Sequence, residues 1–117
     1  MWLFTETGFV SAVVSDIDPT EVSVRSRDKQ SLEELCLIGD LEILELPNRD
    51  YPYRVITTKD VLKEWITQTI DRADYSNYKG RMGQTRGWDF TEALHNVWSA
   101  MHKVTDTASA KKRSLYY

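Results

Sequence analysis

Two arginines alternate near the end of a predicted strand, within the passage VRSRD at residues 24–28. The valines of strand 21–27 occupy alternate positions, so Arg25 and Arg27 stand together on the opposite face. A helix is expected to begin a few residues later, with its free N–H groups beside the two guanidinium groups. This spacing predicts a site for phosphate or carboxylate. The alternative is that Asp28 occupies the helix cap and that acids of neighbouring strands pair with both arginines.

The same sheet face is predicted to carry a third arginine and aromatic side chains. By alternation it holds three arginines with one of two N-terminal pairs: Arg25, Arg27 and Arg54 with Trp2/Phe4 or with Leu3/Thr5. Arginines beside aromatic rings are typical of sheets that stack nucleic-acid bases. Two observations disfavour nucleic acid, namely the missing RNA-recognition motif and the acidic pI near 5.3. The competing interpretation places the aromatic rings in the core or at a dimer interface.

The stretch YSNYKGRMGQTRG, residues 75–87, contains three basic side chains, three glycines and no acid. We expect a loop between two helices, of which the part from Gly80 to Gly87 is mobile until it binds. The residues that would contact a nucleic-acid strand or an acidic protein surface are Tyr78, Lys79, Arg81 and Arg86. A plain connector of the same composition is the alternative.

No other group of residues has the spacing of a catalytic or metal site. His95 and His102 lie about 10 Å apart along one predicted helix, too far to share a metal ion. Cys36 falls on the apolar stripe of a short helix, where a thiol is usually inert. No pair of carboxylates is placed for acid–base catalysis. The sequence therefore predicts no catalytic residue, no metal and no cofactor, and favours a binding role over an enzyme.

Charge is divided unevenly along the 117 residues, although the net charge is only −3. Residues 1–74 contain 15 acids and 8 bases, and residues 75–117 contain 3 acids and 7 bases. The division suits an anionic partner for the basic part, or attraction between the two parts of one domain. The sequence has a single cysteine and no signal-peptide pattern, which predicts a cytoplasmic protein. It also has no apolar run of roughly 20 residues, so we expect no membrane segment.

Hydrophobic periodicity predicts an α+β fold, a small antiparallel sheet with helices packed on one face, as a ferredoxin-like βαββα sandwich. Residues 2–14 are predicted to form two short strands around Thr7-Gly8, or one long strand with a bulge at Gly8. The further predicted strands are 21–27, 41–46 and 53–57, and the predicted helices are 31–38, 58–73 and 89–104. A meander with helices at one end is the alternative topology. Residues 1–104 form one domain, and residues 105–117 form a basic tail that we expect to be disordered.

Several passages resemble a small family of unknown function from actinobacteria, other bacteria and their phages. The resemblance lies in MWLFT–GF at the start, VRSRD, DYPYRV, YSNYK and VWSAM. It covers nearly the whole chain apart from the tail and Gly80 to Gly87. It implies a self-contained domain in a prokaryotic or phage setting, and it implies no activity and no catalytic residues.

Together these features predict a non-catalytic binding module that acts through protein–protein contact. The partner would be another protein or a second copy of the chain, as a homodimer. Nucleic-acid or nucleotide binding through the arginine/aromatic face and the 75–87 stretch is the alternative.

Overall fold

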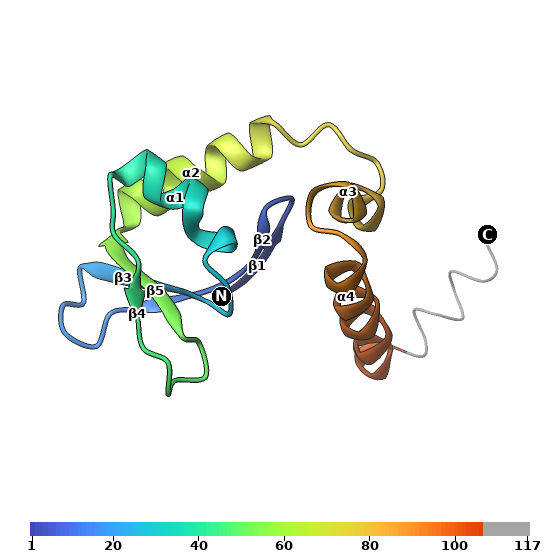
Figure 1. The fold of residues 1–117 in the computed structure, drawn as a ribbon, viewed down its shortest axis with the longest axis horizontal. Coiled ribbons are helices and arrows are strands. Elements are labelled where there is room, and N and C mark those ends of the chain that lie inside the picture. The colour runs from blue at the N-terminus through green and yellow to red at the C-terminus, as the bar shows by residue number, and fades with distance from the viewer. Residues whose placement is uncertain (107–117) are drawn as a thin grey trace.

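The computed structural model describes residues 1–106 and shows an α+β fold with one five-stranded antiparallel sheet (Figure 1). The strands are β1 (Trp2–Thr5), β2 (Gly8–Val14), β3 (Glu21–Ser26), β4 (Leu44–Glu45) and β5 (Tyr53–Thr58). The helices are α1 (Gln30–Gly39), α2 (Lys59–Asp71), α3 (Tyr78–Thr85), α4 (Trp88–Met101) and the 3-10 turn η1 (His102–Val104). The spatial order of the strands is β1-β2-β3-β5-β4.

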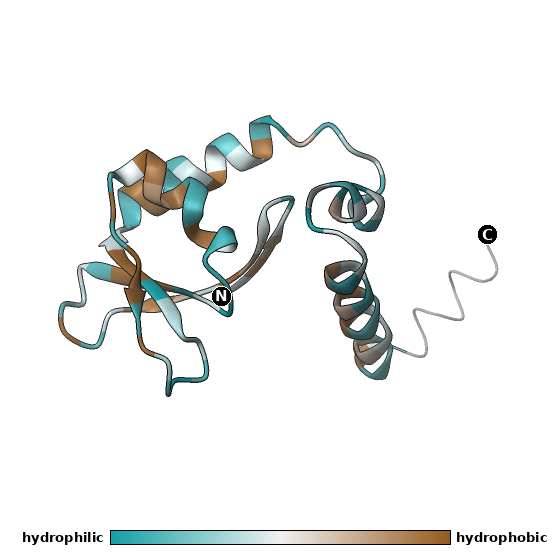
Figure 2. Cartoon of the chain, in the orientation of Figure 1, coloured by the Kyte–Doolittle hydropathy of each residue, from teal (hydrophilic) through white to brown (hydrophobic). Residues whose placement is uncertain are grey.

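The core lies between one face of the sheet and the layer formed by α1 and α2. Val24 of β3 and Val55 of β5 lie opposite each other and are fully buried. Leu35 of α1 and Trp65 of α2 pack over them in the same apolar cluster. Figure 2 shows hydrophobic residues gathered in the strands and in the α1–α2 layer, whereas α4 carries both kinds along its length. Because burial of apolar area is the main driving force of folding, this layer holds the sheet together.

Local signals explain where these helices begin. Thr58 caps α2, because its hydroxyl accepts a hydrogen bond from the Val61 N–H. At α1 the side chain that accepts from the first turn is Asp28, whose Oδ1 binds the Ser31 N–H at 2.9 Å. The Ser31 hydroxyl does not cap the helix, since Ser31 Oγ accepts from Phe9 N–H at 3.2 Å. Thus Asp28, the competing cap, holds this end of the helix.

The predicted antiparallel α+β class is confirmed, and so is the pair of strands around Thr7-Gly8. The ferredoxin-like arrangement is wrong, because the strand order begins with three consecutive neighbours. The turn between β1 and β2 is too short for a crossover helix, so these strands must pair side by side. Strand 41–46 is reduced to β4, two residues long.

The placement of all helices on one sheet face is also wrong. α1 and α2 lie together over the sheet, but α3 and α4 lie beyond the end of the β1–β2 hairpin (Figure 1). Side chains of α4 face the opposite side of the sheet across a pocket. Most of the predicted tail, residues 107–117, lies outside the described residues.

Two leucines on α1 provide a matched test of this core. Leu35 is fully buried, whereas Leu37 is 83% exposed. We expect Leu35→Ala to lower the free energy of unfolding by about 2–5 kcal/mol, because it leaves a cavity under the sheet. Leu37→Ala should change it by less than about 0.5 kcal/mol. Urea denaturation of both variants checks this, and equal losses would show that the sheet–helix core is misplaced.

Candidate functional site

The second face of the sheet, which α1 and α2 leave uncovered, carries aromatic and basic side chains. We call it the aromatic face and define it by these residues: Trp2, Phe4, Phe9, Tyr51, Arg25, Arg27 and Arg54. The strand register sets its composition, because Trp2 pairs with Ser11, Ser11 with Arg25, and Arg25 with Arg54. Residues paired across strands share a face. Of the two N-terminal alternatives, Trp2 and Phe4 therefore join the arginines, while Leu3 packs on the core.

The rings of the aromatic face form one continuous cluster. Phe4 and Phe9 stack with centroids 4.5 Å apart, and Trp2 meets Phe9 edge to face at 5.5 Å. Tyr51 lies 6.4 Å from Phe9 and receives the guanidinium groups of Arg25 and Arg27 at 4.8 and 5.1 Å. Such contacts fix the direction of otherwise flexible arginine side chains.

Tyr51 and Phe9 are residues that sequence reasoning did not assign to the site. Phe9 follows directly from its pairing with Phe4 once the hairpin register is known. Tyr51 precedes Pro52 in the connection before β5, where alternation does not apply. No sequence signal distinguishes it from Tyr53, which packs on the core side.

Within the stretch 75–87, residues Tyr78–Thr85 form helix α3 and not the predicted loop. Asn77 caps α3, since its Oδ1 accepts from the Gly80 N–H at 3.1 Å. Met82 is completely buried, and the Tyr78 hydroxyl donates to the Thr5 carbonyl at 3.0 Å. Burial raises the pKa of Tyr78, so the phenol remains a donor at neutral pH. Tertiary contacts thus stabilise a segment whose glycines favour a loop.

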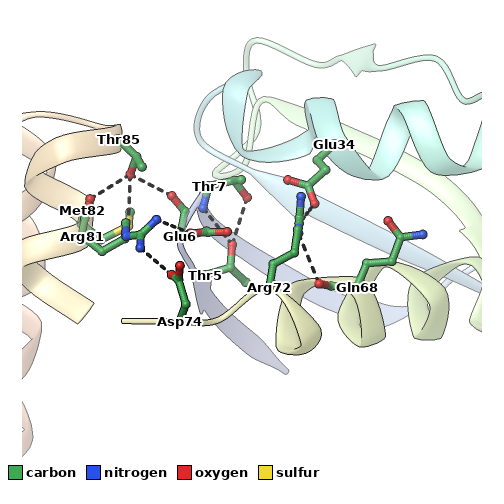
Figure 3. A network of polar contacts seen from close by, with 10 residues as sticks. All are labelled: Thr5, Glu6, Thr7, Glu34, Gln68, Arg72, Asp74, Arg81, Met82 and Thr85. Atoms are coloured by element: carbon green, nitrogen blue, oxygen red, sulfur yellow. Dashed lines mark hydrogen bonds and ion pairs between the residues drawn. The ribbon is translucent and has the colours of Figure 1, made fainter. Parts of the chain in front are cut away.

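Arg81 links α3 to the tip of the β1–β2 hairpin (Figure 3). Its guanidinium lies 3.5 Å from Glu6 and 2.5 Å from Asp74. In the same network the Thr85 hydroxyl donates to the Glu6 carbonyl at 2.9 Å. Lys79, two residues before Arg81, lies 4.8 Å from the ring of Trp98 on α4. The charges of this segment are therefore engaged within the chain.

Arg86 is the most buried of these basic side chains, with 8% of the side chain exposed. It donates to the Thr7 carbonyl at 2.6 Å, to Ser31 Oγ at 3.3 Å and to Asp28 at 2.6 Å. Gly8 is required beneath it, since a β-carbon there would lie 2.5 Å from the guanidinium and 2.1 Å from Ser31 Oγ. Arg86 is thus a structural residue and is not free to contact a partner.

The predicted site residues consequently fall into two separate groups. Arg25, Arg27 and Arg54 share the aromatic face, and no contact among the described residues joins them to Lys79, Arg81 or Arg86. Arg27 is largely exposed and lies 3.6 Å from Asp50. Arg25 and Arg54 are half-buried.

A pocket of about 340 Å³ separates the aromatic face from α4. Trp2, Phe4, Phe9 and Tyr51 line one wall, and Phe90, Leu94 and Val97 of α4 line the other. A second pocket of about 460 Å³ shares Phe4, Leu94 and Val97 with the first and extends to Tyr78 and Trp98. We call the two together the groove. Its walls are mostly apolar, which suits apolar side chains and offers few groups for chemistry.

Residues 1–106 contain no cluster of three or more histidine, cysteine or acidic side chains able to hold a metal ion. Cys36 is half-buried, and burial raises the pKa of its thiol, which makes it a poorer nucleophile. Among the helices of this part of the chain, none is long and apolar enough to cross a membrane.

No family model matches the chain, and neither a curated protein nor a solved structure shows significant similarity to it.

The Arg86 contacts predict a loss of stability on substitution. Arg86→Gln removes a buried guanidinium and, with it, the hydrogen bond to the Thr7 carbonyl and the ion pair with Asp28, so we expect a loss of about 2–3 kcal/mol. Arg72→Gln is the control, because the Arg72–Glu34 ion pair lies at the surface and should contribute at most about 1 kcal/mol. Chemical denaturation measures both, and a smaller loss for Arg86→Gln than for Arg72→Gln would contradict the assignment.

Asp28 predicts a pH dependence of stability. Burial alone would raise its pKa, but hydrogen bonds from Ser31 and the Arg86 guanidinium hold it below the ordinary value of 3.8. A carboxyl with a lowered native pKa stabilises the fold above its unfolded pKa, and that stabilisation is lost as the pH falls through the native pKa.

We therefore expect Asp28→Asn to destabilise the protein at pH 6 and the difference from the parent chain to shrink below a pH of about 4. Unfolding curves collected across this range test the sign. A difference that grows on acidification would show that Asp28 is not stabilised as the ion.

Proposed function

We propose that this chain is a non-catalytic binding module that receives a segment of a partner protein in the groove between the aromatic face and α4. The observation that carries the proposal is the incomplete covering of the groove. Trp2 is 64% exposed on one wall, and Trp98 is 54% exposed on the other. Large aromatic side chains of this kind are enriched at the centres of protein interfaces.

The exposed apolar side chains of α4 support the same proposal. Leu94 is its buried residue, while Val97 and Met101, on the same apolar stripe, remain exposed. Helices in proteins are stabilised chiefly by packing of the apolar face. A fourteen-residue helix whose stripe is mostly uncovered suits a partner that completes the packing.

The charge around the groove defines the kind of segment that fits. Arg25 and Arg27 lie against Tyr51, a residue of the groove wall. A partner segment with apolar side chains would match the walls of the groove, and acidic side chains beside them would match Arg25 and Arg27. The resemblance to bacterial and phage proteins suggests an accessory or host-interaction protein as the setting.

Nucleic-acid binding is the second candidate, and the aromatic face with Arg25, Arg27 and Arg54 is the observation that favours it. It is weaker because the other basic residues that it needs have internal partners. Arg81 contacts Glu6 and Asp74, and Arg86 contacts Asp28. Among the described residues that this candidate names, few cations then remain to neutralise a chain of phosphates. The net charge of −3 also opposes the approach of phosphates.

Selection of short random peptides displayed on phage, with the full chain as bait, tests the proposal. We expect enriched peptides to combine aromatic or aliphatic residues with flanking acids. Val97→Asp should weaken their binding at least about tenfold, because it places a charge in the apolar wall. Leu37→Asp is the matched control, since Leu37 is an exposed leucine on α1, away from the groove, and should bind like the parent chain.

Three outcomes would count against the proposal. Peptides that bind Val97→Asp as well as the parent chain would locate binding elsewhere. A sedimentation equilibrium that shows a dimer disrupted by Val97→Asp would make a second copy the occupant of the groove. Tighter, strongly salt-dependent binding of a single-stranded oligonucleotide would favour the nucleic-acid candidate.

A further inference from the structure

We propose that Arg25 and Arg54 together form an oxyanion site that binds a carboxylate group. The site deepens the proposed function, on which it rests, because it specifies which acidic group of the partner segment is recognised and where. It involves two neighbouring strands at the centre of the sheet, next to the groove.

The strand register brings the two positive charges together. Arg25 of β3 and Arg54 of β5 are direct Cα partners on the same face of the sheet. Side chains in such a pair leave the sheet about 5 Å apart. Like charges directly opposite each other are unfavourable in a sheet, so this pair calls for an anion that lies between the two groups.

Residues 1–106 show no carboxylate paired with either arginine. Four of the arginines in residues 1–106 have a carboxylate partner: Arg27, Arg72, Arg81 and Arg86. Arg25 and Arg54 are the two half-buried arginines of this region without one. The Nε atoms of both are buried and have no hydrogen-bond partner. A charge that is partly removed from water without a counter-ion costs free energy, which an external carboxylate would offset.

Two acids close to Arg54 in the strand pairing or in the sequence have other partners. Asp50 lies 3.6 Å from Arg27, and Glu45 of β4 forms an ion pair with Lys29. Neither is therefore the missing counter-ion of Arg25 or Arg54.

Arg25 is also held in a fixed orientation. One of its terminal nitrogens donates to the buried Ser11 hydroxyl at 2.8 Å, and its guanidinium lies 4.8 Å from the centre of the Tyr51 ring. A guanidinium fixed in this way loses little freedom when it binds an oxyanion. Because Tyr51 also lines the groove, a carboxylate on the arginine pair lies beside the apolar part of the same segment.

Carboxylate and phosphate both fit paired guanidinium groups. We favour carboxylate because residues 1–74, which contain both arginines, carry a net negative charge, with 15 acids against 8 bases. Net negative charge penalises a doubly charged phosphate more than a single carboxylate.

The test follows the side-chain Nε–H signals of Arg25 and Arg54 by NMR, with the full chain at constant ionic strength. The probes are a capped diglutamate peptide, the matched diglutamine peptide and inorganic phosphate. We expect saturable shifts of both signals with diglutamate, none with diglutamine, and weaker binding of phosphate. Equal shifts with both peptides, or tighter binding of phosphate, would overturn the carboxylate site.

Substitutions locate the binding. Arg25→Gln with Arg54→Gln should weaken diglutamate binding about tenfold or more. Arg49→Gln removes the same kind of charge from an exposed turn and should leave binding within about twofold. If the double variant and Arg49→Gln lose diglutamate affinity equally, the binding would depend only on net charge and not on the arginine pair. If the double variant does not fold, the Arg25 Nε–H signal is followed in the single variant Arg54→Gln. In that variant we expect the signal no longer to shift on addition of diglutamate.

The unliganded protein offers an independent readout. Since the pair repels in the absence of an anion, Arg54→Gln should leave the melting temperature unchanged or raise it. A clear decrease in melting temperature would show that Arg54 stabilises the sheet and would overturn the proposal.

The outcomes for the two proposals can be told apart. If groove peptides bind normally while diglutamate does not, the oxyanion site is rejected and the binding module remains. Diglutamate binding without any groove peptide would reject the groove instead.

Discussion

The hydrogen bonds of the buried Arg86 guanidinium determine how α3 and α4 are placed relative to the sheet. The guanidinium donates hydrogen bonds to a carbonyl in the β1–β2 turn, to a hydroxyl at the start of α1 and to a carboxylate just before α1. Because guanidinium is rigid and planar, it can satisfy three acceptors only when their elements are correctly placed. The residue thus connects α3 and α4 to the sheet with a defined geometry, which apolar contact alone would not specify.

The groove is a result of this connection. α3 is fixed to the hairpin tip through Tyr78, Arg81 and Thr85, and Gly87 turns the chain into α4 with a φ of 85°. At such a positive φ, glycine is favoured over other residues. α4 then extends along the aromatic face while its own stripe remains incompletely packed. Because α4 is held at one end opposite the sheet, the groove is open but already formed, as the proposed binding of a partner segment requires.

Some of this architecture can be read from the sequence, and the reason differs between elements. The alternation in Glu21 to Arg27 placed the valines and arginines on the correct faces, because the period of a strand is two everywhere. The strand order could not be predicted from the sequence, since it depends on which strands pair in three dimensions. Helix α3 was missed because Gly80 and Gly83 lower its intrinsic propensity, while its stabilising partners are far away in the sequence. The same distance hid the role of Arg86, whose charge looked available in a basic stretch.

The contacts of Arg86 also bear on the order in which the protein folds. They join residues 55 to 79 positions apart in the chain, so closing these loops costs entropy before any contact is gained. Ribosomes release the N-terminus first, and all three acceptors of Arg86 belong to residues 1–31. We therefore expect the sheet with α1 and α2 to assemble early and to serve as a template on which the last two helices dock. The uneven charge along the sequence would then guide a late step of folding, as the basic end of a nascent chain meets an acidic body that is already complete.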